Sequence, residues 1–361
     1  MLGISTESGP LPVAPPLSPM LARLARELPA GGYLYEPKWD GFRCLAFRHG
    51  LEVDLRSRND RPLARYFPEL VDALVAISEP RFVVDGEIVI AHPGEFDFDA
   101  LLSRLHPARS RVERLRRETP ATLIVFDLLA SGGDDLRDRP FVERRTELER
   151  LLSRPGPHLV ATPLTDDLEL ATSWLDRFRG GGVDGVVAKR SDRPYRPGAR
   201  EMVKVKRETT AECVVAGARL LTDRPVLSSL LLGVYDGDGV LRHVGVATQF
   251  TEERRRELLV DLEPHVVSLA GHPWEAGFLM GGSPIGRLKG AAARWSPEEM
   301  ELDWVPIEPV LVCEVAYDHF DRDRLRHPAR FRRWRPDRDP PSCTLEQFAA
   351  PGPRATGLIS R

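Results

Sequence analysis

One lysine of this chain stands in a setting that suits a nucleophile. Lys38 lies in the segment Glu36-Pro37-Lys38-Trp39-Asp40-Gly41-Phe42-Arg43, at the end of a run expected to form a strand. Asp40-Gly41 predicts a tight turn, and a glycine lets the backbone approach a bulky ligand. A lysine amine held at such a fixed point can form a covalent bond once it has lost its proton. An ordinary exposed lysine before a β-turn would show the same short pattern.

Six further short motifs follow Lys38 in order, and each would be weak evidence alone. They are Ser57-Arg58-Asn59, Asp85-Gly86-Glu87, Phe126-Asp127, Asp184-Gly185-Val186-Val187, Lys204-Val205-Lys206 and Arg335-Pro336-Asp337-Arg338. With the lysine segment, this order over nearly the whole chain resembles the covalent nucleotidyltransferase superfamily. Within it, the sequence is most similar to the ATP-dependent DNA ligases, and among these to the small bacterial C-type enzymes.

The resemblance implies a role for each matching residue. Lys38 would attack the α-phosphate of ATP, giving lysyl-AMP and pyrophosphate. Glu36 would read the adenine amino group, and Phe126 would stack on the base. Glu87 would accept a hydrogen bond from the ribose. Arginines would hold the ribose and phosphates, although each could instead form a surface ion pair; they are Arg43, Arg58 and Arg200.

The chemistry also needs positive charge near the amine, because an ammonium group cannot attack. A bound Mg²⁺ or Mn²⁺, with Lys204 and Lys206, would lower the pKa of Lys38. The expected metal ligands are Asp184 and Glu87. Two positions depart from the family pattern: Asp184 stands where glutamate is usual, and Arg338 stands where lysine is usual. Arg335 and Arg338 would contact pyrophosphate.

The elements that must position these residues suggest an α+β fold. The expected nucleotidyltransferase (adenylation) domain, residues 1–206, has antiparallel sheets flanked by helices. Its proline-rich residues 9–20 suit an extended strap over the domain. Strands are expected at 33–39, 44–48 and 51–55 (joined by His49-Gly50), 82–84, 87–90 and 121–129. Helices are expected at 67–77, 141–152 and 168–178.

Residues 207–361 are expected to form a second domain, a C-terminal OB-fold β-barrel. Strands are predicted at 212–219, 229–235, 240–247 and 310–317, and a helix at 251–262 with Thr251 as its N-cap. Residues 281–295 are expected to form a mobile loop. The family pattern makes residues 206–208 the candidate hinge, about which the second domain would swing between adenylation and DNA sealing.

Composition agrees with a globular protein of two domains: 361 residues, 42% hydrophobic and 29% charged. The net charge of −3 gives no sign of a nucleic-acid binder. However, eight arginines and two aspartates between Arg322 and Arg338 give 8 − 2 = +6, interleaved with Phe331 and Trp334. That mixture suits phosphate contact, and a solvated charged face is the alternative. The four cysteines form no CxxC pair, which argues against zinc and disulfides.

We therefore predict an ATP-dependent DNA ligase that seals 3′-OH/5′-phosphate nicks in duplex DNA, as a monomer and within DNA repair, with other repair proteins as candidate partners. The alternatives are an RNA ligase, a capping guanylyltransferase, or a nucleic-acid-binding module with an inactive core. No P-loop motif supports a P-loop ATPase. With no signal peptide and no apolar run long enough to span a membrane, we expect a bacterial cytoplasmic location, at the nucleoid.

Overall fold

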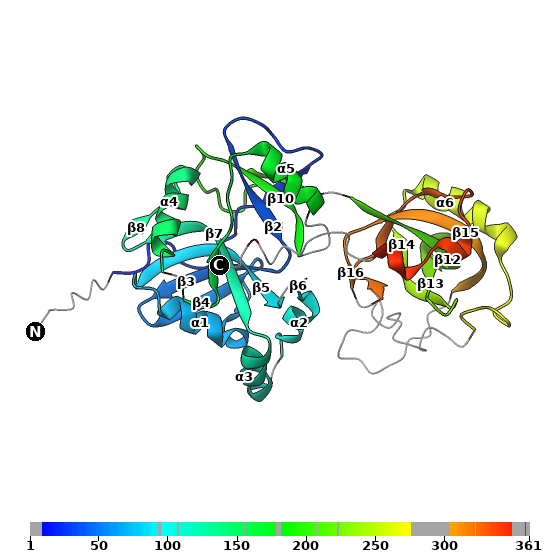
Figure 1. Cartoon of the computed structure of the whole chain (residues 1–361), viewed down its shortest axis with the longest axis horizontal. Helices are drawn as coiled ribbons and strands as arrows, with labels where there is room; N and C mark the ends of the chain where they lie inside the picture. Colours follow the sequence, from blue (N-terminus) through cyan, green and yellow to red (C-terminus); the bar gives the residue numbers. More distant parts are fainter. Residues whose placement is uncertain are drawn as a thin grey trace, which may run out of the picture. The chain divides into compact units, whose positions relative to one another are not determined.

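A computed structural model of the chain (Figure 1) describes residues 9–92, 95–106, 108–154, 156–177, 182–206, 208–221, 224–275, 304–321, 323–348 and Leu358. These residues form two compact units, 9–206 with Leu358 and 208–348. Leu358 packs against the core of the first unit, whereas the sequence prediction placed all of 207–361 in the second. No helix among the described residues is long and apolar enough to cross a bilayer. The predicted loop at 281–295 lies outside the described residues.

The larger sheet of the first unit has the strand order β4 (Glu52–Ser57), β3 (Phe42–His49), β5 (Arg81–His92), β7 (Ala121–Ser131), β8 (Asp134–Asp135). Two short strands extend this sheet: β6 (Glu95–Phe96) pairs with β5, and β9 (Leu159–Ala161) pairs with β7. Among the described strand pairs of this sheet, the β7–β9 pair is parallel and the others are antiparallel. Helices α1 (Pro68–Val75) and α4 (Phe141–Leu151) pack against β7. The continuous apolar run expected to be a buried strand is therefore confirmed in β7, which has helices on its flank.

A second, smaller sheet has the order β1 (Ala22–Ala25), β11 (Met202–Val205), β10 (Val183–Arg190), β2 (Tyr33–Trp39). Helix α5 (Leu168–Arg177) packs on β10 and β2. One apolar cluster ties the two sheets together, since Tyr35 and Trp39 of β2 share it with Val89 of β5 and Ile124 of β7. The two sheets thus face each other across a common core.

The structure differs from the sequence prediction in several local details of the first unit. The β3–β4 turn is Gly50-Leu51, one residue later than expected, because Gly50 adopts a φ of 63° that favours glycine. The two runs expected around Asp85 are one strand, β5. The sequence analysis did not predict strands β1, β10 and β11, nor helices α2 (Phe98–Ser103) and α3 (Arg109–Glu118).

The second unit is a closed five-stranded barrel in its described part, and it confirms the predicted OB-type architecture. The strand order is β12 (Thr209–Leu221), β13 (Arg224–Tyr235), β14 (Leu241–Thr248), β18 (Ala329–Trp334), β15 (Val305–Tyr317). Helix α6 (Glu252–Leu262) packs on β13, and the Thr251 hydroxyl caps it by accepting from the Arg254 backbone N–H at 3.2 Å. The barrel is filled by apolar side chains from all five strands.

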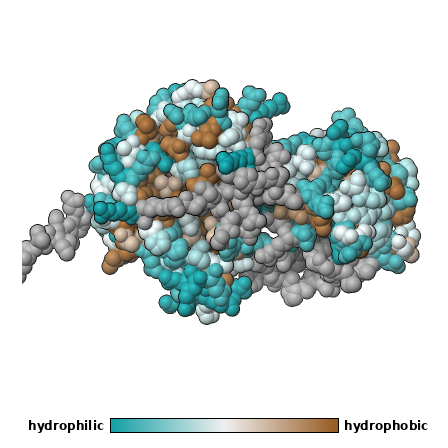
Figure 2. Space-filling view, in the orientation of Figure 1, coloured by the Kyte–Doolittle hydropathy of each residue, from teal (hydrophilic) through white to brown (hydrophobic). Residues whose placement is uncertain are grey.

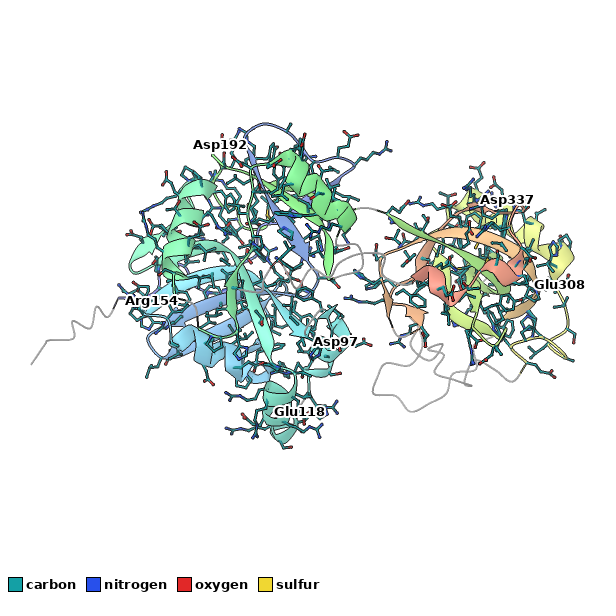
Figure 3. The ribbon with its side chains drawn as sticks, in the orientation of Figure 1. Asp97, Glu118, Arg154, Asp192, Glu308 and Asp337 are labelled. Carbon is teal, nitrogen blue, oxygen red and sulfur yellow. The ribbon has the colours of Figure 1, made fainter. Side chains whose placement is uncertain are left out.

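Polar and charged side chains lie on exposed parts of the first unit. Helix α3 projects from the first unit and is hydrophilic in Figure 2, with only Val112 buried. Charged side chains such as Glu118 and Asp192 lie at the outer edge of the same unit (Figure 3). All four cysteines are free and buried, as the sequence spacing suggested.

Candidate nucleotide-binding site

A cavity lies between the two sheets of the first unit, and most of the residues singled out from the sequence line it. Strand β2 contributes Glu36 and Lys38, while β3, β5 and β7 contribute one residue each. The sequence-predicted residues in the lining are Glu36, Lys38, Arg43, Arg58, Glu87, Phe126, Arg200 and Lys204. Motifs between Glu36 and Lys204, 204 − 36 = 168 positions apart, thus meet because paired strands carry them to one place. Two close approaches of the backbone also require glycine, at Gly41 and Gly86.

The Lys38 amine is held by a carboxylate from β10, the neighbouring strand of the same sheet. Its Nζ donates to Asp184 Oδ2 at 2.7 Å, and Lys206 forms an ion pair with the same oxygen. An oxygen of Asp40 lies within 4.8 Å of an oxygen of Asp184. Burial alone would lower the pKa of Lys38, but the charges of Asp184, Glu87 and Asp40 outweigh it, and the pKa is raised.

This direction is opposite to the one expected from the sequence. The physical reason is that the unliganded lysine faces a carboxylate at hydrogen-bond distance. Lys206 shares that carboxylate, and Lys204 lies near enough for the charge of Lys38 to lower its pKa. Lys38 is therefore an ammonium group in this state.

Cations nevertheless gather at the same end of the cavity. Burial, together with the charges of Lys38, Lys206 and Arg58, lowers the pKa of Lys204. Arg200 lines the same cavity. Several positive groups on a concave surface suit a polyphosphate ligand.

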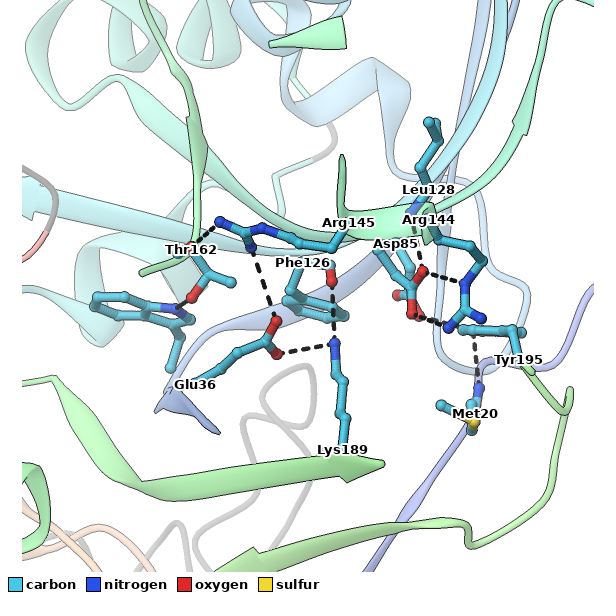
Figure 4. Close-up of polar contacts among 12 residues, drawn as sticks. Met20, Glu36, Asp85, Phe126, Leu128, Arg144, Arg145, Thr162, Lys189 and Tyr195 are labelled. Atoms are coloured by element: carbon cyan, nitrogen blue, oxygen red, sulfur yellow. Dashed lines mark hydrogen bonds and ion pairs between the residues drawn. The ribbon is translucent and has the colours of Figure 1, made fainter. Parts of the chain in front are cut away.

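The cavity lining also contains a buried glutamate, Glu36, which forms ion pairs with Lys189 and Arg145 (Figure 4). Glu36 is only 3% exposed, and its Oε2 accepts from Lys189 Nζ at 2.8 Å. Arg145 Nη1 stays 3.9 Å from Oε1, and no described residue hydrogen-bonds that oxygen. Burial raises the pKa of Glu36, against the pull of Lys189 and Arg145. A buried acceptor without a donor is costly, so this oxygen suits a ligand N–H group.

Phe126 forms part of the cavity wall, and two cations lie over its ring. The Arg43 guanidinium lies 4.5 Å from the ring centroid and Lys189 Nζ lies 4.8 Å from it. Lys189 also donates to the Phe126 carbonyl at 3.0 Å. Arg43 makes two 2.6 Å hydrogen bonds to the fully buried Asp85, so much of its donor capacity is used inside the protein. Arg43 therefore lines the cavity with a side chain that Asp85 holds in place.

Glu87 is paired in register with Arg43 on the neighbouring strand. Burial raises the pKa of Glu87 to about 7, although the charges of Arg43 and Lys38 pull it down. This carboxyl group therefore changes its charge close to neutral pH. A strongly shifted carboxyl group in a cleft is typical of a functional site.

Arg335 and Arg338 belong to the other unit, where both pair with Glu212 of β12. Arg335 also makes a two-bonded ion pair with Asp337, with distances of 2.8 and 2.7 Å. The two aromatic residues of the arginine-rich segment contact α6: Arg254 lies over Phe331, and the Trp334 indole donates to Asp261. Phe331 and Trp334 thus make contacts within the second unit. The arginines next to them in sequence are Arg330, Arg332 and Arg333.

The sequence analysis missed part of the site. Lys189 lies two residues after the Asp184–Val187 motif and was given no role, yet it contacts both Glu36 and Phe126. The segment Pro19–Ala22 also lines the cavity through Pro19, Leu21 and Ala22. No spacing pattern pointed to these apolar residues. The two-residue distance from Val187, which lines the cavity, could have indicated Lys189, because alternate residues of a strand share a face.

Comparisons with known proteins agree with this architecture. Residues 18–206 match the family model described as the ATP dependent DNA ligase domain, and residues 223–338 match the ATP dependent DNA ligase C terminal region. DNA ligase C2 of Mycolicibacterium smegmatis is 48% identical, over 97% of this chain and 99% of its own length. DNA ligase C of Mycobacterium tuberculosis is 47% identical, over 94% and 96%. A solved Lig E DNA ligase shares the fold, with a TM-score of 0.54, 18% identity and coverage of 88% and 99%.

Proposed function

Because this chain belongs to the ATP-dependent DNA ligases, among the bacterial C-type enzymes, we propose that it seals 3′-OH/5′-phosphate nicks in duplex DNA through AMP carried on Lys38. We further propose a role in DNA repair, and the domain limits 1–206 for adenylation and 207–361 for the OB-fold region, except that Leu358 packs in the first unit. One observation carries the assignment. Lys38 and Glu36 line one cavity, together with Phe126 and the cationic side chains of Arg58, Arg200 and Lys204.

The cavity offers complementary groups along the length of ATP. Glu36 Oε1 would accept from the adenine amino group, and the base would lie against Phe126. Glu87 would accept from a ribose hydroxyl once it is ionised. Arg58, Arg200 and Lys204 would neutralise the phosphates, with Lys206 at the Asp184 side. Arg43 would act mainly by holding Phe126 in place.

Transfer of AMP to Lys38 needs the ammonium group to lose its proton. The Lys38 Nζ–phosphorus bond then forms while the bond from the α-phosphorus to pyrophosphate breaks. In the unliganded chain, Asp184 opposes this loss by stabilising the ammonium group. A cation bound to Asp184 would compete with Lys38 for this carboxylate and so favour release of the proton to solvent. Arg335 and Arg338 would stabilise the departing pyrophosphate, exchanging Glu212 for it.

The residues near Lys38 fit a divalent cation. Asp184 and Asp40 bring hard carboxylate oxygens within 4.8 Å of each other. Like Asp184, Glu87 has a charge that raises the pKa of Lys38. Asp184 and Glu87 are the proposed ligands of Mg²⁺ or Mn²⁺. When bound, the cation would supply positive charge that polarises the phosphoryl oxygens.

Two assays test this function. In the first assay, purified protein is incubated with radiolabelled ATP or with radiolabelled GTP. In the second, it is given a DNA duplex that contains one nick, with a nicked RNA duplex as the comparison. We expect a labelled protein with ATP only, and ligation of the nicked DNA. Label transfer from GTP would favour a guanylyltransferase, and preferential joining of the RNA would favour an RNA ligase. Absence of both label and ligation would leave a binding module with an inactive core.

A further inference from the structure

Behind the cavity wall, a buried tyrosine joins two parts of the nucleotide site that are far apart in sequence. Tyr195 is 1% exposed and does not line the cavity itself. Its hydroxyl donates to Asp85 Oδ2 at 2.7 Å and accepts from the Met20 backbone N–H at 2.8 Å (Figure 4). One hydroxyl therefore uses both its donor and an acceptor on groups that water does not reach.

The first of these contacts leads to the wall of the cavity. Asp85 Oδ1 and Oδ2 accept two bonds from Arg43, which places the guanidinium over Phe126. Tyr195 provides a further donor to the same fully buried carboxylate. Burial beside Asp85 raises the pKa of Tyr195, so the hydroxyl keeps its proton and remains a donor. The orientation of the Asp85 carboxylate, and with it the Arg43 fork, depends on this bond.

The second contact leads to the N-terminal segment. Met20 is held on both sides, since its N–H donates to Tyr195 and its carbonyl accepts from Arg43 Nη2 at 3.2 Å. The residues on either side of it, Pro19 and Leu21, line the cavity. Leu21 is also bonded to β11, where its carbonyl accepts from the Met202 N–H. Fixing Met20 thus fixes one wall of the nucleotide site.

We propose that Tyr195 is a positioning residue for ATP, which aligns the Arg43–Phe126 wall through Asp85 and the Pro19–Ala22 wall through Met20. This inference rests on the proposed function, since it assumes that ATP occupies the cavity. Removing the hydroxyl would leave Asp85 short of a donor and the Met20 N–H without its acceptor. A hydrogen bond to a charged group contributes enough that its loss changes binding by roughly tenfold.

The test measures lysyl-AMP formation over a range of ATP concentrations. We expect Tyr195→Phe to raise KM for ATP by roughly tenfold and to change kcat by less than about twofold. The matched control is Tyr35→Phe, which removes another buried hydroxyl of the same unit, one that donates to the Pro29 carbonyl at 2.7 Å. It should leave KM unchanged. An unchanged KM in Tyr195→Phe, or an equal rise in both variants, would overturn the proposal.

A coupling measurement separates positioning from general loosening. Arg43→Lys keeps the charge beside Asp85 but cannot form the two-bonded fork. If Tyr195 acts through that fork, Tyr195→Phe should add much less to KM in the Arg43→Lys background than in the wild type. Full additivity would contradict the Arg43 part of the proposal.

A measurement on the unaltered chain covers the case in which Tyr195→Phe does not fold. Hydrogen exchange of the Met20–Ala22 amides should slow when the protein is loaded with AMP, and exchange that does not change would contradict the Met20 part. Wild-type protein that forms no lysyl-AMP would instead mean that the proposed function has failed.

Discussion

At the scale of single residues, the site depends on how two ionisable groups are held. Lys38, the proposed nucleophile, is paired with Asp184 at 2.7 Å, and the charge of this carboxylate raises its pKa against the effect of burial. Glu87 is the reverse case, a carboxyl group that burial keeps protonated up to about pH 7. The sequence identified both residues, but it could not give either pKa, because each depends on charges that only the folded sheets bring near.

The raised pKa of Glu87 predicts a pH dependence of stability. The ordinary pKa of this carboxyl group is 4.5, and in the folded chain it is about 7. Between these values the unfolded chain has lost the proton while the folded chain retains it. Rising pH therefore favours the unfolded chain, and this contribution destabilises the fold by roughly 3 kcal/mol at most. Urea unfolding should show that the free energy of unfolding of the wild type declines between pH 5 and 8. This decline should be smaller in Glu87→Gln.

The control is Glu52→Gln, which replaces an exposed carboxylate on the same sheet. It should leave the pH profile of the wild type unaltered. Profiles of wild type and Glu87→Gln that run parallel from pH 5 to 8 would count against the assigned pKa.

At the scale of secondary structure, the turn between β2 and β3 places Lys38 and Arg43 on different sheets. A Cβ atom added at Gly41 would lie 2.2 Å from the Ile88 carbonyl oxygen of β5. Backbone cannot move away as a flexible side chain can. The close packing of this turn on β5 therefore needs glycine.

We predict that Gly41→Ala lowers the free energy of unfolding by roughly 1–3 kcal/mol. It should slow lysyl-AMP formation as well, because the strain falls between the two sheets that form the cavity. Thermal unfolding and intact-mass measurements check the two effects. Gly156→Ala is the control, since an added Cβ there meets nothing within 4 Å. Equal stability of the two variants would show that the turn tolerates a side chain.

Much of the element order could be predicted from the sequence, and the exceptions have physical causes. Apolar runs revealed β2 and β7, and helical periodicity revealed α1, α4 and α5, because these elements bury one face or both. Strands β1 and β11 have four residues each, too few for a pattern to emerge. Their pairing is parallel and joins residues 180 positions apart, as in Ala22 with Met202 (202 − 22 = 180). Local sequence contains no signal for such a contact, so the Pro19–Ala22 wall was missed.

At the scale of the whole molecule, the proposed chemistry is divided between two units. The first contains the nucleotide cavity, and the second carries Arg335 and Arg338, which pair with Glu212. The seven motifs could be placed in order from the sequence, because each is short and local. The partners of the last motif could not, since Glu212 lies on a different strand, more than 120 residues earlier.

We predict that Arg335→Ala slows lysyl-AMP formation by roughly 100-fold, because a donor for the departing pyrophosphate is lost. Sealing of a nick that already carries AMP on its 5′-phosphate should change much less, since no pyrophosphate leaves in that step. Rates of both steps, measured separately, check the difference. Arg242→Ala removes another ion-paired arginine of the second unit, bonded to Asp236, and should spare both steps. Equal losses in the two steps would contradict a role confined to pyrophosphate.

The central claim concerns the Lys38 amine, and intact-mass spectrometry with and without ATP tests it most directly. The wild-type chain should gain the mass of one AMP when ATP and Mg²⁺ are present, and peptide mapping should place that AMP on Lys38. Lys38→Ala should gain none and should not seal a nicked duplex. AMP attached to the Lys38→Ala variant, or a wild-type chain that seals nicks without ever carrying AMP, would contradict the account.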